Sequence, residues 1–158
     1  MPIHDGDQLA KFSLAVRESS LKRLRSVPEG FENWRPSLNA MSFADLAHEL
    51  ASADQWLIRN VGRSVLTKTE GRCGQAGTVT RTEYVGLLDE LEALGKQRAQ
   101  LLAGLTDQAL ERRLFDERFG ETTVWWIIVR GNLDHEAHHR GQVATYLRII
   151  SDTPNSTT

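Results

Sequence analysis

The sequence lacks several features that would assign it to a membrane or to the secretory pathway. It has one cysteine, Cys73, and therefore no second cysteine with which to form an internal disulfide. No stretch approaches the roughly 18 consecutive apolar residues that a membrane-spanning helix needs. The start, residues 1–5, lacks the basic and then apolar layout of a secretory signal. These absences predict a protein of the reducing cytoplasm that does not enter a membrane.

The sequence also lacks an excess of positive charge. Nineteen Lys and Arg residues stand against twenty-one Asp and Glu residues, and the net charge is −2. Binding to a phosphate backbone requires a basic face. The richest basic stretch, residues 22–25, is short and fits a solvated helix face. Nucleic acid is therefore not expected as a partner.

What the chain does have is the composition of an ordinary globular domain. Apolar residues make up 40% and charged residues 25% of its 158 residues. A chain of this length fits one domain and can bury most of its apolar surface. We expect a single domain over residues 1–150, followed by a polar tail over residues 151–158.

Apolar residues recur at helical spacing in four long stretches. The predicted helices span residues 7–26, 42–60, 80–104 and 122–150. Two of them open on Ser42 with Asp45 and on Thr80 with Glu83, which is the pattern of a capping box. A short helix is predicted over residues 106–115 and a turn over residues 119–121. No stretch shows a convincing strand alternation.

Four long helices in a chain of this size predict an all-α four-helix bundle. The connection over residues 62–80 is long and rich in glycine. Extended at up to ~3.3 Å per residue, it can cross a bundle about 30 Å long. A crossing connection favours up-down-down-up topology with a crossover between the second and third helices, although a surface excursion would also use a long loop.

The strongest local pattern is His135 followed four residues later by His139. Two residues four apart lie on one face of a helix, about 6 Å apart along its axis. Their imidazoles can occupy adjacent positions on one ion at ~2.0–2.1 Å each. His48, on the second predicted helix and beside its apolar stripe, is the best candidate for a third ligand. Three imidazoles would leave coordination positions open for water or substrate.

Other roles for these residues compete with metal binding. A lone histidine such as His48 is more often half-buried and hydrogen-bonded, and a pair at this spacing occurs by chance on many helices. His135, Glu136 and His139 also satisfy His-Glu-x-x-His, the zinc-peptidase pattern. No ligand follows on a later element and no strands are predicted, so a peptidase is disfavoured. Glu136 is then a candidate base in another reaction or a solvent-facing residue, while His138 and Cys73 have no assigned role.

These residues resemble the DinB/YfiT-like family of small four-helix metalloproteins. The resemblance lies in Trp34-Arg35-Pro36, in the start at Met41 with Leu46-Ala47-His48, and in the block from His135 to Gln142 with Tyr146-Leu147-Arg148. It implies a trihistidine metal site at His48, His135 and His139. It also implies an up-down-down-up bundle and a homodimer, to which Trp125 or Trp126 could contribute.

What the resemblance implies about activity is broader. Characterised members include thiol-dependent S-transferases, so we expect a metal-dependent enzyme, a transferase or a hydrolase, acting on a small molecule such as a low-molecular-weight thiol. The rival hypothesis is a noncatalytic metal- or ligand-binding bundle, for example one related to stress. We expect zinc or nickel, with iron, manganese and copper as alternatives, because imidazole suits most of these ions.

Overall fold

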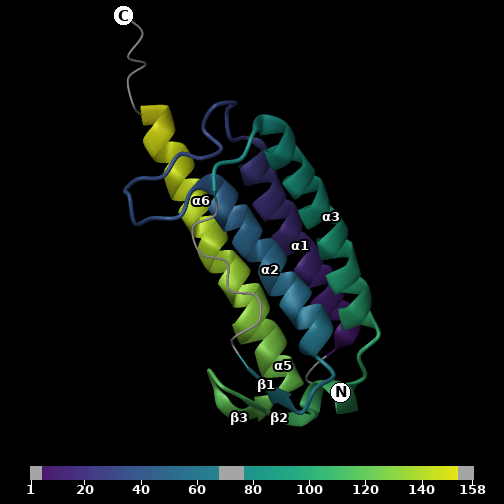
Figure 1. The fold of residues 1–158 in the computed structure, drawn as a ribbon. Coiled ribbons are helices and arrows are strands. Elements are labelled where there is room, and N and C mark those ends of the chain that lie inside the picture. The colour runs from purple at the N-terminus through teal and green to yellow at the C-terminus, as the bar shows by residue number, and fades with distance from the viewer. Residues whose placement is uncertain (1–4, 68–76, 153–158) are drawn as a thin grey trace, which may run out of the picture.

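The computed structural model describes residues 5–67 and 77–152, and most of these residues are helical. His4, Cys73 and residues 153–158 of the polar tail lie outside the described residues. Four long helices lie side by side and a small sheet covers one end of them (Figure 1). The long helices are α1 (Gly6–Arg25), α2 (Phe43–Asn60), α3 (Arg81–Ala103) and α6 (Asp134–Asp152). No helix of the described segments is long and apolar enough to cross a membrane.

The starts of α2 and α3 are the capping boxes that the sequence predicts. The Ser42 hydroxyl accepts from the backbone N–H of Asp45 at 3.0 Å, and the Asp45 carboxylate accepts from the backbone N–H of Ser42 at 2.9 Å. Thr80 and Glu83 form the same reciprocal pair at the start of α3. Each box satisfies two backbone donors that have no partner inside the helix.

Contacts between the helices show which ends meet. Arg81, at the start of α3, donates to the carbonyl of Val27 just beyond α1, at 2.9 Å. Arg98, near the end of α3, donates to Ser13 in the first half of α1 at 2.6 Å, so α1 and α3 run in opposite directions. The ring of Phe43, the first residue of α2, lies 5.5 Å from that of Tyr146 late in α6.

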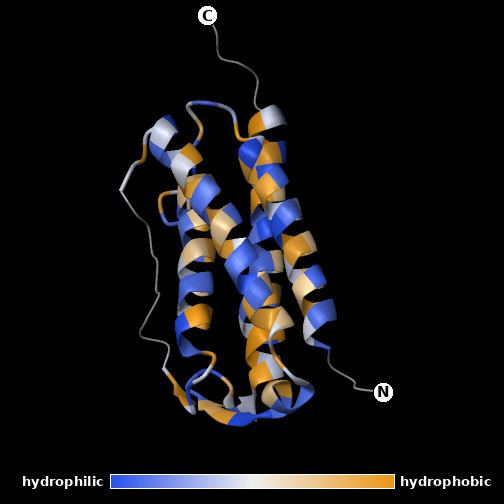
Figure 2. Ribbon diagram, turned by 90° about the vertical axis from the view of Figure 1, so that its right-hand side faces the viewer, coloured by the Kyte–Doolittle hydropathy of each residue, from blue (hydrophilic) through white to orange (hydrophobic). Residues whose placement is uncertain are grey.

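The helices bury two apolar clusters. One lies where α2 and α3 begin and contains Phe43, Tyr84 and Val143. The other lies at the end near the sheet and contains Trp56, Leu102 and Ile127. Figure 2 shows apolar residues recurring along each helix between hydrophilic ones, which is the pattern of amphipathic helices packed around a common core.

The small sheet was not predicted. It contains β1 (Val65–Leu66), β2 (Arg113–Asp116) and β3 (Gly120–Thr123), with β1 parallel to β2 and β2 antiparallel to β3. The expectation of no strands was therefore wrong, and the predicted short helix is confined to α4 (Asp107–Glu111). Strands this short give too few alternating positions to be distinguished from a turn of helix. The turn predicted over residues 119–121 lies slightly earlier, over residues 117–119, and Gly120, whose φ of 72° suits glycine, is the first residue of β3.

The last predicted helix is also interrupted. The structure has a short α5 (Val124–Trp126) and a π-helical segment, η1 (Ile127–Leu133), before α6. At the end of η1 the N–H of Asp134 donates to the carbonyl of Val129, five residues back. A π-helical turn keeps the apolar spacing nearly helical, so the sequence pattern did not reveal it.

Candidate metal centre

His135 and His139 lie together on the first two turns of α6, as their spacing predicts. Their Nε2 atoms are 2.9 Å apart and their rings are nearly perpendicular, at 88°. Two Nε2 atoms this close cannot both carry a hydrogen directed at the other, so at least one is a bare acceptor. His139 is buried, whereas 30% of the His135 side chain is exposed.

Gln142 sets the orientation of the buried imidazole. Its side-chain carbonyl lies 2.6 Å from Nδ1 of His139, one turn earlier on α6. Because a carbonyl oxygen only accepts, Nδ1 carries the hydrogen and the Nε2 lone pair of the neutral ring is available. Burial lowers the pKa of His139, an effect that the bond to Gln142 opposes. The neutral form, which is the form that binds metal ions, is thereby favoured.

The third group is a carboxylate that sequence reasoning missed. Glu49, on α2, places Oε1 3.4 Å from Nε2 of His135. Its other oxygen, Oε2, is buried and has no hydrogen-bond partner among the described residues. One ligand atom each from Glu49, His135 and His139 lie within 4.8 Å of one another. We call these three residues the metal group.

The metal group fits the geometry of a bound divalent ion. Ligand atoms at ~2.0–2.2 Å from one ion, at octahedral to tetrahedral angles, lie about 2.9–3.5 Å apart. The separations of 2.9 Å between the two imidazoles and 3.4 Å between His135 and Glu49 fall in this range. A buried carboxylate oxygen without a partner is rare in a folded protein, and an ion would satisfy it.

The predicted ligand His48 precedes Glu49 on α2. It is half-buried and does not belong to the metal group. Neighbouring residues on a helix are rotated by about 100°, so spacing could place the ligand-bearing face near His48 but could not choose between the two positions. His138 is exposed, with its ring 5.2 Å from that of His139.

Glu136, the residue between the two ligand positions of α6, points elsewhere. It is 1% exposed and lies among two arginines, an aspartate and an asparagine. The interpretation of Glu136 as a solvent-facing residue was therefore wrong. Its side chain points about 100° away from that of His135 around the helix axis, and it faces the interior of the bundle.

The groups around Glu136 form a buried ion network, a name we use for Arg17, Asp54, Arg98 and Glu136. Arg98 donates to Asp54 at 2.9 Å and to Glu136 at 2.5 Å, and Arg17 donates to the same two carboxylates at 2.7 Å and 2.8 Å. All four side chains are at most 3% exposed. Asn132 also donates to Asp54, at 3.3 Å. The two positive and two negative charges cancel.

The electrostatics of the network make Glu136 unsuited to accept a proton near neutral pH. Burial alone would raise the pKa of Glu136, but Arg98 and Arg17 together lower it to about 2. Both of its oxygens are occupied by guanidinium groups. These contacts argue against Glu136 as a general base, whether in a peptidase or in another reaction.

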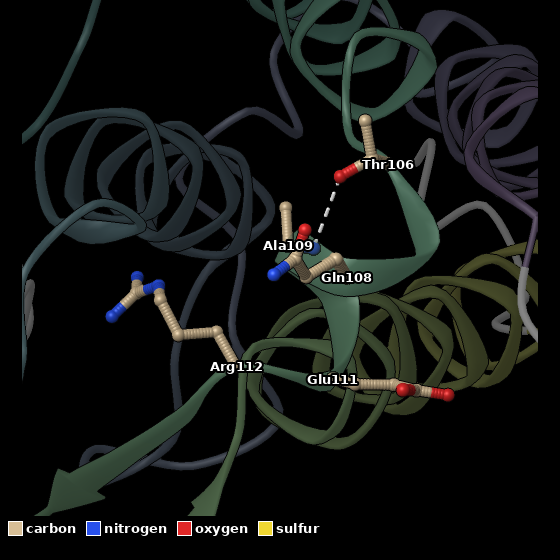
Figure 3. A pocket seen from close by; sticks show the side chains of 5 residues that line it. All are labelled: Thr106, Gln108, Ala109, Glu111 and Arg112. Atoms are coloured by element: carbon tan, nitrogen blue, oxygen red, sulfur yellow. Dashed lines mark hydrogen bonds between the residues drawn. The ribbon is translucent and has the colours of Figure 1, made fainter.

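A surface pocket lies away from the metal group, beside α4. It is lined by Thr106, Gln108, Ala109, Glu111 and Arg112. In Figure 3 the charged side chains of Glu111 and Arg112 extend in opposite directions, and the Thr106 hydroxyl caps α4 by accepting from Ala109. Binding sites bring a few polar groups to converge on a ligand, and these side chains do not converge.

Comparison with known proteins points to one family. A model of the DinB superfamily matches residues 14–143. Among solved structures, the crystal structure of a DinB-like protein, YjoA, from Bacillus subtilis is similar, with a TM-score of 0.68 and 17% sequence identity over 92% of this chain and 94% of that chain. At this identity the likeness concerns the fold. No match was found among curated proteins.

Proposed function

We propose, from the premise that the chain belongs to the DinB superfamily, that it is a metal-dependent enzyme acting on a small molecule. The metal would be held by Glu49, His135 and His139. The observation that carries the proposal is the buried Oε2 of Glu49, which has no hydrogen-bond partner in the described part of the chain and lies beside two imidazoles whose Nε2 atoms face each other. Three protein ligands leave coordination positions open, as catalytic sites do and closed structural sites do not.

A donor set of two imidazoles and one carboxylate differs from the trihistidine set predicted from the sequence. It suits zinc, and it also suits iron(II), for which two histidines and one carboxylate form a common site. We keep zinc and nickel as the leading ions and iron as the next. Such an ion, when bound, supplies a Lewis acid that can activate water or hold a thiolate.

The chain's own residues would prepare this site in two ways. Gln142 fixes the His139 ring so that Nε2 faces the ligand position. Glu49 supplies a negative charge, which binding of a cation would compensate. His48, half-buried next to Glu49, remains the alternative ligand from α2.

The class of reaction is a thiol-dependent S-transfer or a hydrolysis, with a low-molecular-weight thiol as the candidate substrate. The alternative is a noncatalytic metal- or ligand-binding bundle, for example one related to stress. We also propose up-down-down-up order for the four long helices, supported by the contacts of α3 with α1 and of α6 with α2.

A cytoplasmic homodimer is proposed as well, with Trp126, which is 43% exposed, as a contact residue. Trp125 is half-buried against the apolar cluster near the sheet.

Metal analysis of the protein purified without an affinity tag tests the site. We expect close to one divalent ion per chain in the wild type, and loss of the ion in Glu49→Gln and His139→Ala. His138→Ala is the matched control, because His138 is exposed on the same helix turn, and it should keep the ion. Full occupancy in both Glu49→Gln and His139→Ala would overturn the proposal.

His48→Ala decides which residue of α2 is the ligand. Retention of the ion in His48→Ala, with loss in Glu49→Gln, assigns the position to Glu49. The opposite result assigns it to His48 and restores the trihistidine set.

Catalysis is tested separately on the metal-loaded protein. We expect turnover of a chloro-aromatic electrophile with at least one low-molecular-weight thiol, or hydrolysis of an ester, and loss of that turnover after chelation. Absence of metal-dependent turnover in both assays would favour the noncatalytic alternative.

A further inference from the structure

The two carboxylates of the buried ion network lie on the same two helices, α2 and α6, as the metal group. α2 carries Glu49 and, five residues later, Asp54, whereas α6 carries His135 and, directly after it, Glu136. At 1.5 Å per residue, Glu49 and Asp54 are about 7.5 Å apart along the axis of α2. The network therefore joins the two ligand-bearing helices within about one and a half turns of the metal group.

The network joins these helices through two independent bridges. Arg98, from α3, donates to both Asp54 and Glu136, and Arg17, from α1, donates to both of them as well. Arg17 is held further by the carbonyl of Leu91 at 2.6 Å, and Arg98 by Ser13 at 2.6 Å. Both guanidinium groups are thus fixed to α3 or α1 while they bind carboxylates of α2 and α6.

These bridges restrict both sliding and rotation of α6 against α2. A slide by one residue would move α6 by 1.5 Å and displace Glu136 from the positions at which it accepts from Arg98 at 2.5 Å and from Arg17 at 2.8 Å, so that these hydrogen bonds would lengthen and lose their alignment. The same slide would change the 3.4 Å separation between Glu49 and His135. A rotation that withdraws Glu136 from the guanidinium groups would also turn the neighbouring His135 ring away from Glu49.

We propose that the buried ion network is the positioning device of the metal group. It fixes the axial and rotational register of α2 and α6, and this register sets the separation of Glu49 from His135 and His139. Glu136 is then a positioning residue that acts through His135. The inference rests on the proposed metal binding, and it explains why the acidic residue of His-Glu-x-x-His is buried away from the ligand position.

The inference is tested by titrating the metal-free protein with Co²⁺. Binding is monitored through the visible absorption of the bound ion. Glu136→Gln removes one charge of the network and keeps the side-chain shape. We expect its Kd for Co²⁺ to rise about 10–100-fold, the usual effect of changing a group that orients a ligand, and the absorption bands to shift as the coordination geometry changes.

Asp45→Asn is the matched control. Asp45 is a buried carboxylate on the same α2, and its contacts include the cap of that helix and Arg35, at 3.2 Å. Its loss should destabilise the fold and leave the Kd and the spectrum of bound Co²⁺ at their wild-type values. An equal rise of Kd in Asp45→Asn and Glu136→Gln would show a general loss of stability and overturn the inference.

Arg98→Lys provides a second variant in case Glu136→Gln does not fold. It keeps the charge but loses the planar fork that binds two carboxylates at once, so the Kd should again rise. Wild-type Kd and spectrum in a folded network variant would overturn the inference and leave the metal site intact. Absence of saturable Co²⁺ binding by the wild type would instead overturn the proposed function itself.

Discussion

Two polar clusters on α2 and α6 differ in how their charges are satisfied. In the buried ion network every carboxylate oxygen of Asp54 and Glu136 accepts a hydrogen bond from a guanidinium group. In the metal group one oxygen of Glu49 is buried and has no hydrogen-bond partner within residues 5–67 and 77–152. Buried polar groups are nearly always hydrogen-bonded. The buried ion network therefore stabilises the fold, and the metal group is the better candidate for binding a ligand.

The largest expected effect on stability comes from removing one arginine of the buried ion network. Arg98→Met leaves Asp54 and Glu136 buried with one guanidinium between them. Breaking a buried ion pair in this way costs about 3–5 kcal/mol of unfolding free energy, measurable by urea denaturation. Arg113→Met is the control, because Arg113 is 71% exposed in its side chain, and it should change stability by less than about 0.5 kcal/mol. Equal effects of the two substitutions would contradict the difference between the clusters.

The second largest expected effect is a loss of stability in acid, as Glu136 of the buried ion network becomes protonated. The pKa of Glu136 is about 2 in the folded protein against 4.5 in an ordinary glutamate. A depressed pKa contributes stability that is full above pH 4.5 and is lost as the pH falls from 4.5 towards 2, roughly 3 kcal/mol in all. Unfolding free energies measured between pH 7 and pH 3 should fall more steeply for the wild type than for Glu136→Gln. Parallel curves would mean that Glu136 does not carry this charge.

A smaller effect tests how rigidly the network is held. A Cβ at Gly95 of α3 would lie 2.8 Å from Cγ of Arg17, whereas a Cβ at Gly86 of the same helix would meet no described atom within 4 Å beyond its own stretch of helix. We expect Gly95→Ala to cost about 1–3 kcal/mol by overpacking, and Gly86→Ala to stabilise the protein by about 0.5–1 kcal/mol. Denaturation midpoints measure both. Stabilisation by both substitutions would show that Arg17 can shift freely.

The smallest effect on stability is expected for a substitution in the metal group. Glu49→Gln, measured in the presence of a chelator, should change the unfolding free energy by no more than about 0.5 kcal/mol, because the carboxylate it removes makes few bonds. A loss as large as that caused by Arg98→Met would instead place Glu49 among the residues that hold the fold together.

Features that depend on neighbouring residues were predictable from the sequence. The capping boxes at Ser42 and Thr80 are local hydrogen-bond patterns, and both form where predicted. The four-residue spacing of His135 and His139 likewise determines a shared helix face, and the two rings meet. In each case the physics that decides the outcome acts within one turn of helix.

Features that depend on distant residues were not predictable in the same way. Arg17 and Glu136, which pair in the network, are 119 residues apart, and no local pattern distinguishes them from charges on a solvated face. The sequence pattern pointed to His48 and not to Glu49, because histidine is the scarcer ligand type and because neighbouring residues of a helix differ by only about 100° in direction. A carboxylate next to a candidate histidine, at the edge of an apolar stripe, was the available signal.

The strands of the small sheet show the same limit. Each of β2 and β3 has four residues, and β2 alternates exposed and buried positions from Arg113 to Asp116. That alternation is the signal that could have identified the strand, but four residues fit a helical turn almost as well. In the structure this segment pairs over all four residues with β3 and over two residues with Val65 and Leu66, far earlier in the chain.

The buried ion network also has a consequence for how the protein opens. It takes one charged group from each of α1, α2, α3 and α6, so no long helix can detach alone without leaving a buried charge uncompensated. The four helices should therefore open together as one cooperative unit. Amide protons in the middle of all four should exchange with deuterated solvent at a common free energy, while α4 and the edges of the sheet exchange sooner.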